Sequence, residues 1–313
     1  MSAISEANFV DLYLGDGFAD VKGLPGQPTR VPAPESWGVE IEQLRARCQE
    51  HFNKTLEPEF SLILDEAVYR VTQLQDLHAQ SLFVLSKSAV QILQLDDLGL
   101  PDELHQNLFN PAIRGLIFIC GEMSSGKTSS AASILVARLE RLGGMALTVE
   151  DPPEPLLQGE HGPGRCIQVP VSRRQGGYEE ALIRALRTRA EILMVGEVRD
   201  TPTAVQVVQA SINGHFIICT GHAGSVTQGI ERLASLAQPK VPNAKDLLAQ
   251  GLIAVIHQTL VADSQGFKRL KLQCLSLTGS DGPGIREKIR TGKTQMLEQD
   301  IANQSSRSLW NDQ

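Results

Sequence analysis

The sequence predicts an α/β protein in which a parallel sheet is covered by helices on both faces, preceded by a small α+β module. Two observations predict the sheet: fully apolar strands alternate with amphipathic helices, and a glycine-rich loop joins one such strand to one such helix. The length of 313 residues fits two domains and a small appendage. We expect domains at 1–100, 101–238 and 239–313, the last one mostly helical.

The N-terminal module shows helical and strand patterns in turn. Trp37–Phe52 carries apolar side chains at helical spacing, which predicts one buried helix face. Phe60–Leu64 and Val68–Val71 flank an acidic turn in a hairpin-like pattern, and Ser81–Leu85 has the pattern of a further strand. We therefore expect an antiparallel sheet with helices on one side.

The second region repeats strand, loop and helix. A short helix is expected around Glu103–Phe109, and Gly115–Cys120 is a continuous apolar run that predicts a buried strand. Ser129–Leu142 follows as an amphipathic helix, which Gly143 and Gly144 end. The remaining elements are strands at Met145–Val149, Ile192–Val195 and Phe216–Thr220, and helices from Thr201 to Gly214 and from Ser225 to Ala237.

The pattern changes after Pro239. We expect Val241–Thr259 to be mostly helical and a hairpin to turn through Ser264–Gly266. The other expected elements are strands at Leu260–Ala262 and Leu270–Leu277, short helices at Ile285–Arg290 and Gln295–Ala302, and a frayed tail at Asn303–Gln313.

Composition excludes several classes of protein. Hydrophobic residues make up 42% and charged residues 21%, which excludes disorder of the whole chain. The net charge of −7, without a basic block, argues against nucleic acid as a direct partner. Five scattered cysteines without a CxxC pair fit a reducing compartment. The N-terminus lacks a signal-peptide pattern and no apolar run approaches about 20 residues, so we expect a cytoplasmic protein that reaches a membrane only through a partner.

The strongest motif is Gly121–Thr128, GEMSSGKT, which matches G-x-x-x-x-G-K-[ST] between a predicted strand and helix. Glycines let the backbone form a nest of N–H groups around phosphate oxygens, and the helix N-terminus adds positive potential. Lys127 is expected to bind the β- and γ-phosphates, and Thr128 to offer its hydroxyl to Mg²⁺. The residues expected to contact the nucleotide are Gly121, Ser124, Ser125, Gly126, Lys127, Thr128 and Ser129.

Hydrolysis also needs acidic groups near the attacking water and the metal ion. Glu150 and Glu197 each follow a predicted strand, and ligands of open α/β sheets bind beyond the carboxyl ends of the strands. Both residues are thereby aimed at the phosphates. The alternative is that they are solvated loop carboxylates.

Histidine and arginine residues complete the candidate set. His222 stands at the end of the predicted strand Phe216–Thr220, where a neutral imidazole reaches a γ-phosphate, and His215 at its start fits a structural role equally well. Arg173 and Arg174 lie in a glycine-flanked loop, and guanidinium groups suit the charged phosphate of the transition state. A solvated charged face is the expectation for the arginines that follow, Arg184 and Arg189.

With these motifs in order, the chain resembles the type II/IV secretion and type IV pilus traffic ATPases. The segments that match are GEMSSGKT, VEDPPEP, ILMVGEVRD, GHFIICTGHAGS and the later His257–Leu260. The resemblance covers about residues 95–300. It is looser over Asp11–Leu14 and Tyr69–Val71, which are similar to a PAS-like N-terminal domain. It implies a RecA-like P-loop NTPase core and a homohexameric ring.

The resemblance also implies roles for individual residues. Glu150 corresponds to the general base, Glu197 to the Walker B acid that reaches Mg²⁺ through water, and His222 to the γ-phosphate sensor. Arg173 and Arg174 stand where the family places arginines that act across a subunit boundary. The expected cofactors are ATP and Mg²⁺, and the expected partner is an inner-membrane platform of a pilus or secretion system.

Within the superfamily, the length and the segment GPGIREKI are most similar to PilT-type retraction ATPases. The larger assembly ATPases carry a tetracysteine zinc insertion that this sequence lacks. The primary hypothesis is a hexameric motor powered by ATP hydrolysis. The alternatives are a weakly hydrolysing nucleotide-binding regulatory ring subunit and a small-molecule kinase that uses the same loop.

Overall fold

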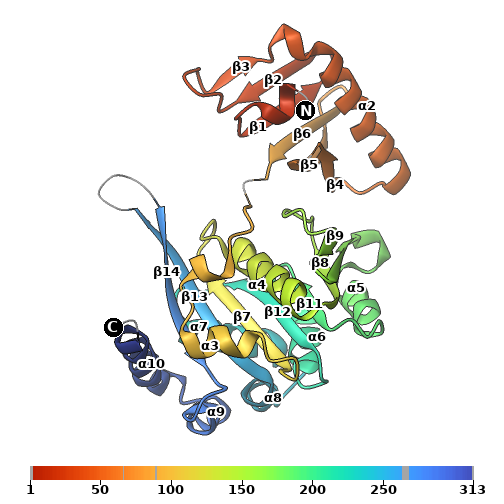
Figure 1. The fold of residues 1–313 in the computed structure, drawn as a ribbon. Helices are drawn as coiled ribbons and strands as arrows, with labels where there is room; N and C mark the ends of the chain where they lie inside the picture. The colour runs from red at the N-terminus through yellow and green to blue at the C-terminus, as the bar shows by residue number, and fades with distance from the viewer. Residues whose placement is uncertain (1–2, 66, 89, 263–267, 312–313) are drawn as a thin grey trace. The chain divides into compact units, whose positions relative to one another are not determined.

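The computed structural model describes residues 3–65, 67–88, 90–262 and 268–311. The chain divides into two compact units (Figure 1). Unit 1 comprises Met1–Val90 together with two later loops, Asp151–Leu156 and Pro170–Gln175. Unit 2 comprises Gln91–Glu150, Leu157–Val169 and Gly176–Gln313. Within the described ranges, no helix has the length and apolar character to cross a bilayer.

Unit 1 is built on an antiparallel sheet in the order β3-β2-β1-β6-β5-β4. Helix α2 buries Ile41, Leu44 and Cys48 in a core with Tyr69 and Phe83, as its helical spacing predicts. The elements are α1 (Ala3–Glu6), β1 (Asp11–Gly15), β2 (Phe18–Lys22), β3 (Arg30–Pro32), η1 (Glu35–Trp37), α2 (Gly38–Thr55), β4 (Glu59–Leu64), β5 (Ala67–Gln75), β6 (Ser81–Lys87) and, in the second of the later loops, η3 (Arg173–Gln175).

The expected hairpin is confirmed, because β4 and β5 pair antiparallel and turn at Asp65, whose φ of 52° is left-handed. Glu66, the second acidic residue of that turn, lies outside the described residues. Ser81–Leu85 is also a strand, as expected, and pairs with β5 and β1. The PAS-like character of this module stays a prediction.

Unit 2 is built on a mixed sheet in the order β14-β13-β7-β12-β11-β8-β10-β9, of which β13, β7, β12, β11 and β8 run parallel. Every residue of β7 is buried because both faces of the sheet are covered. Ile117 and Ile119 join the core that α4 lines, whereas Phe118 and Cys120 lie against Gly229 of α7 on the opposite face. The strands are β7 (Gly115–Gly121), β8 (Gly144–Glu150), β9 (Gly159–His161), β10 (Gly164–Pro170), β11 (Ile192–Val195), β12 (Phe216–His222), β13 (Leu252–Ala262) and β14 (Lys268–Ser276).

The helices of unit 2 follow the expected alternation with the central strands. The cap of α7 agrees with the sequence signal, because Ser225 accepts from Gln228 N. At α6 the cap is Asp200, whose side chain accepts from Thr203 N, and it lies one residue before Thr201, where the cap was expected. The helices are η2 (Leu95–Leu98), α3 (Asp102–Leu108), α4 (Lys127–Leu142), α5 (Gly177–Leu186), α6 (Thr201–Ala210), α7 (Val226–Ala237), α8 (Ala244–Gly251), α9 (Gly282–Arg290), η4 (Thr294–Met296) and α10 (Leu297–Asn311).

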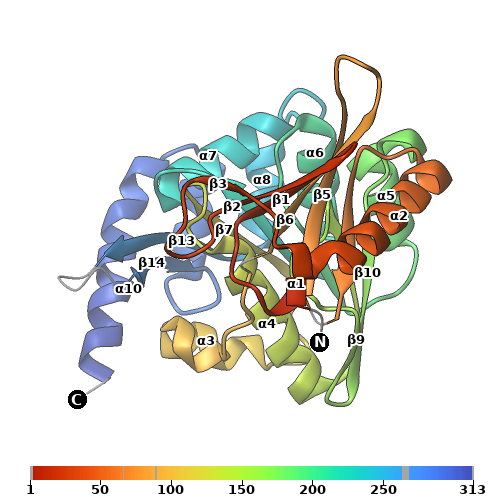
Figure 2. The same cartoon turned by 90° about the horizontal axis from the view of Figure 1, so that it is seen from above.

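The C-terminal region corrects two expectations. The helix expected over Val241–Thr259 ends at Gly251, and Leu252–Ala262 is a strand inserted beside β7. Its apolar residues from Leu252 to Ile256 are buried on both faces, a pattern that periodicity cannot distinguish from a buried helix. The expected turn at Ser264–Gly266 lies outside the described residues. Residues 303–311, which were expected to fray, belong to α10, which packs beside β14 (Figures 1 and 2). Asp312 and Gln313 lie outside the described residues.

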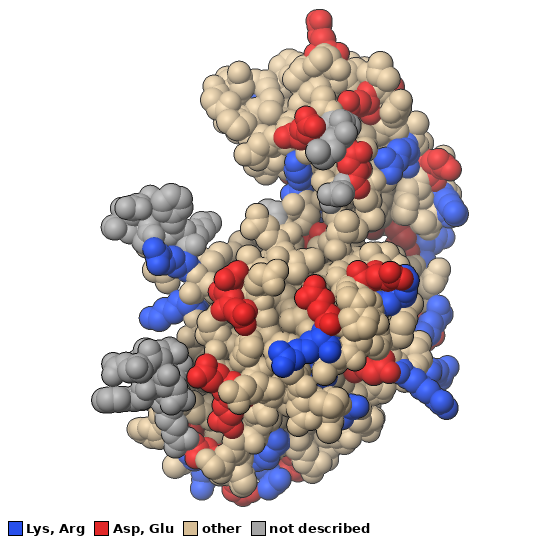
Figure 3. All heavy atoms as spheres, in the orientation of Figure 1, with Lys and Arg blue, Asp and Glu red and all other residues tan. Residues whose placement is uncertain are grey.

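After β14 the C-terminal region is helical, in α9 and α10, as expected. The strands β9 and β10 were not predicted; they are short and carry few apolar residues. On the face drawn in Figure 3, basic and acidic side chains are interspersed over the surface of unit 2. The expectation about nucleic acid stays a prediction.

Candidate functional site

The phosphate loop lies between β7 and α4, as the motif predicts. Strand β7 ends at Gly121 and α4 begins at Lys127. Ser124 and Gly126 have φ values of 57° and 86°, so the loop uses left-handed backbone conformations at two positions. Gly121 is required by packing, because a Cβ there would lie 2.3 Å from the carbonyl oxygen of Gln258. The backbone geometry is that of an anion-binding nest.

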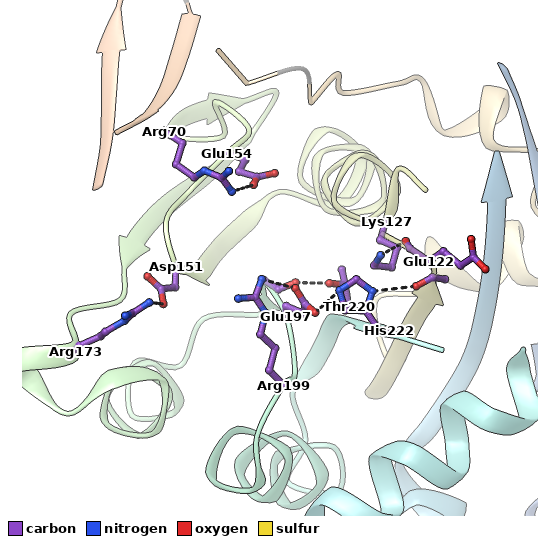
Figure 4. Close-up of polar contacts among 12 residues, drawn as sticks. Arg70, Glu122, Lys127, Asp151, Glu154, Arg173, Glu197, Arg199, Thr220 and His222 are labelled. Atoms are coloured by element: carbon purple, nitrogen blue, oxygen red, sulfur yellow. Dashed lines mark hydrogen bonds and ion pairs between the residues drawn. The ribbon is translucent and has the colours of Figure 1, made fainter. Parts of the chain in front are cut away.

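Lys127 is folded onto this loop, and its Nζ donates to the carbonyl oxygen of Glu122 at 2.6 Å (Figure 4). Burial lowers the pKa of the Lys127 ammonium, and the nearby Glu197 carboxylate opposes this shift. Thr128 and Ser129 form the first turn of α4, where N–H groups lack intrahelical partners. The loop thus places an ammonium, two hydroxyls and the helix N-terminus in one segment.

Glu197 and His222 meet at the adjacent strand ends. His222 is the last residue of β12, which pairs with β7, and its Nδ1 lies 3.3 Å from the carbonyl oxygen of Gly121. Its Nε2 lies 2.9 Å from Oε1 of Glu197, whose Oε2 accepts from Arg199 at 2.7 Å (Figure 4). An oxygen thus lies near each ring nitrogen of His222. The structure therefore brings Glu197, His222 and the start of the phosphate loop together.

Glu150 ends β8, the strand parallel to β11, and is only 2% exposed. Its Oε1 accepts from the Thr148 hydroxyl at 2.6 Å and from the Gln168 amide at 3.1 Å. A Cβ on Gly196, the residue before Glu197, would lie 3.3 Å from Cγ of Glu150. The two acids therefore come from neighbouring strand ends, which the sequence pattern predicts.

Arg173 and Arg174 belong to unit 1, in the loop Pro170–Gln175. Both are exposed, and the guanidinium of Arg173 lies 2.9 Å from Oε2 of Glu59 and 3.5 Å from Oδ2 of Asp151. Asp151 directly follows Glu150 in the chain. Their role across a subunit boundary stays a prediction.

Several polar residues of the site were not singled out from the sequence. Arg199 stands two residues after Glu197, and in an extended segment this spacing places both side chains on the same side. A pocket of about 410 Å³ beside the phosphate loop is lined by Glu122 and His222 and by Gln228 and Arg232 of α7. The i, i+4 spacing of the last two places them on one helix face. Gln168 reaches Glu150 from β10, a strand that was not predicted, so sequence spacing offers no signal for it.

This fold and loop define an α/β protein of the phosphate-loop class. The family model described as "Type II/IV secretion system protein" matches residues 60–309. The chain therefore belongs to the type II/IV secretion system protein family, as the sequence motifs indicate.

Relatives within the family differ in how much of their length is matched. The type IV pilus retraction ATPase PilT of Pseudomonas aeruginosa is 28% identical over 92% of this chain and 83% of its own. The putative type II secretion system protein E of Escherichia coli is 34% identical, over 67% of this chain but 40% of its own.

Two solved structures share the fold. The pilus retraction motor PilT with bound ADP has a TM-score of 0.76 at 22% identity and covers 98% of this chain and 91% of its own. The Legionella pneumophila ATPase DotB has a TM-score of 0.73 at 18% identity and covers 93% and 84%. The expected α/β fold with its parallel-stranded core is thereby confirmed.

Proposed function

We propose that this chain is an ATP-hydrolysing motor subunit. In this proposal it forms a cytoplasmic homohexamer and works on an inner-membrane platform of a type IV pilus or secretion system. The family membership and the relatives named as pilus retraction and secretion proteins support this function. The observation that carries it is the meeting of Glu197 and His222 with the phosphate loop, because hydrolysis needs acid and phosphate groups at one place.

Nucleotide binding uses groups that are already in position. The nest and the N-terminus of α4 attract the phosphates. The ammonium of Lys127 exchanges the Glu122 carbonyl for β- and γ-phosphate oxygens, a charge-assisted contact that is stronger than the one it replaces. In this proposal His222, at the end of β12, contacts the γ-phosphate.

The oxygen donors fit Mg²⁺, which prefers one or two protein ligands completed by phosphates and water. The residues that would hold it are Thr128, through its hydroxyl, and Glu197, through its carboxylate. Within the described ranges, no group of three or more His, Cys, Asp or Glu residues is arranged to hold a metal ion without the nucleotide. When bound, the ion neutralises negative charge on the β- and γ-phosphates.

Glu150 serves as the general base in this proposal. Its carboxylate orients the attacking water and accepts the proton, while Thr148 and Gln168 hold one of its oxygens. Arg173 and Arg174 stabilise transition-state charge at the nucleotide of a neighbouring subunit. Each subunit of the ring thus contributes to its own site and to the next one.

The test is ATP turnover by the purified chain beside Lys127→Ala and Glu150→Gln. The motor predicts turnover by the wild type that both substitutions abolish. Equal, near-zero rates in all three would instead support the regulatory ring subunit. Phosphorylation of a metabolite without net ATPase activity would support the kinase.

A further inference from the structure

Gln258 is a buried amide in contact with the phosphate loop. It lies in β13 opposite Gly121 of β7, and its side chain is fully buried. Its Nε2 donates to the carbonyl oxygen of Ser125 at 2.6 Å. A Cβ on Gly126 would lie 3.2 Å from the same nitrogen. The amide therefore packs directly against the peptide that joins Ser125 to Gly126.

The orientation of that peptide decides whether the loop attracts or repels a phosphate. A trans peptide is planar, so a carbonyl that points to one side fixes the following N–H on the other. The amide of Gln258 holds the Ser125 carbonyl toward β13, which turns the Gly126 N–H away from β13. If the peptide were reversed, the loop would present a carbonyl oxygen, with its partial negative charge, where an N–H donor is needed.

We propose that Gln258 is a positioning residue of the phosphate loop, which fixes the peptide between Ser125 and Gly126 in the orientation that binds a nucleotide phosphate. It acts through the backbone and touches no reacting atom. The inference rests on the proposed function only in that the loop binds nucleotide phosphates. It does not depend on hydrolysis, ring formation or the identity of a partner.

Two further observations support this assignment. The flexible position Gly126, with φ of 86°, is next to the held carbonyl, so the peptide has conformational freedom that a contact must restrict. In the part of the chain that the structure describes, Oε1 of Gln258 and Oγ of Ser125 are buried without hydrogen-bond partners. A side chain kept at such a cost fits a specific demand for the hydrogen bond that its amide nitrogen donates.

The experiment measures ADP affinity of the full chain with a fluorescent ADP analogue. Gln258→Met keeps the length of the side chain but removes the donor, and we expect the ADP Kd to rise about tenfold. At saturating ATP, kcat should change less than KM, because the contact aids the bound ground state and the transition state alike. Gln273→Met is the matched control, since Gln273 is exposed on β14, and its Kd should equal that of the wild type.

Gln258→Glu provides a second measurement, the pH dependence of ADP affinity, which a loss of side-chain packing alone would not change. An ionised carboxylate only accepts hydrogen bonds and would repel the Ser125 carbonyl, whereas the protonated acid donates to it. Burial raises carboxyl pKa values, so lowering the pH from about 8 to about 5.5 should restore ADP affinity toward that of the wild type. Each protein is compared with itself at the two pH values, and the change in Gln258→Glu is then set against the change in the wild type, so a constant difference in folding between the two does not enter.

The inference is overturned if Gln258→Met binds ADP as tightly as the wild type. It is equally overturned if the affinity of Gln258→Glu, relative to wild type, is independent of pH. A wild-type chain that binds no ADP would contradict the proposed function as well. Tight binding by the wild type and Gln258→Met alike would contradict this inference alone.

Discussion

The phosphate loop and the arginine loop are held in different ways. The phosphate-loop region has buried strands on both sides, and its functional side chains stand at the ends of parallel strands. The arginine loop, Pro170–Gln175, exposes its guanidinium groups, and Arg173 is paired with the acids Glu59 and Asp151. The sheet fixes the side chains at its strand ends, whereas the action on a neighbouring subunit that we propose for the arginines requires that they remain at a surface.

The largest effect is expected at the buried cation of the phosphate loop. Lys127→Ala removes the ammonium that faces the β- and γ-phosphates, and we expect nucleotide affinity to fall by about a hundredfold or more. Titration with a fluorescent ATP analogue measures this loss. Lys240→Ala, an exposed lysine after α7, is the control and should bind as the wild type does. Undiminished affinity in Lys127→Ala would contradict the proposal that this loop binds the nucleotide.

Glu150→Gln should separate binding from hydrolysis. The amide keeps the shape of the side chain but cannot accept the proton of the attacking water, so kcat should fall by about 10²–10³ while ATP still binds. Steady-state turnover and ATP titration measure the two quantities. The exposed Glu140→Gln at the end of α4 serves as the control. Turnover that survives in Glu150→Gln would assign the base to another group.

A smaller effect is expected at His222. His222→Gln loses the imidazole contact to Glu197, but Arg199 still pairs with that carboxylate, so kcat should fall by about tenfold. His215→Gln at the opposite end of the same strand is the matched control. Equal rates in both variants would mean that His222 has no part in sensing the phosphate.

The arginine loop is tested by mixing subunits. Arg173→Ala should still bind nucleotide, because its own phosphate loop is intact. It should lose turnover, because the neighbouring site then lacks the guanidinium group. If Arg173 acts on a neighbour, rings that mix Arg173→Ala with Lys127→Ala subunits contain some complete sites, and turnover should exceed that of either variant alone. Activity that follows simple dilution would contradict the action across subunits.

The smallest effect is expected at the ion pair between Arg70 and Glu154 within unit 1. The charged atoms lie 3.6 Å apart, and both side chains are more than a third exposed. A double-mutant cycle on thermal stability should give a coupling below about 1 kcal/mol. A larger coupling would mean that the loop after Glu150 is held more firmly than its exposure indicates.

The difference between the two regions also explains what the sequence could predict. Gly121, Lys127, Glu150, Glu197 and His222 were predictable because parallel strands carry their terminal residues to one edge of the sheet. Gln168 was not singled out, because it reaches Glu150 from β10, a strand that was not predicted. Arg199 was also not singled out, although its place two residues after Glu197 offered a signal.

The fold shows the same contrast. The central strands and the helices that follow them in 115–237 were predicted by their periodicity and caps, whereas β9 and β10 were not. Strand β13 was expected to be mostly helical, because a strand buried on both faces lacks the alternation that identifies strands. The arginine loop has no periodic pattern, so only its composition and the family resemblance drew attention to it.

A crystal structure of the chain with a non-hydrolysable ATP analogue and Mg²⁺ tests the central claim most directly. The account predicts that the terminal phosphate contacts Lys127 and that the carboxylates of Glu150 and Glu197 face it. Phosphates bound away from Gly121–Thr128, or both carboxylates turned away from the terminal phosphate, would contradict it.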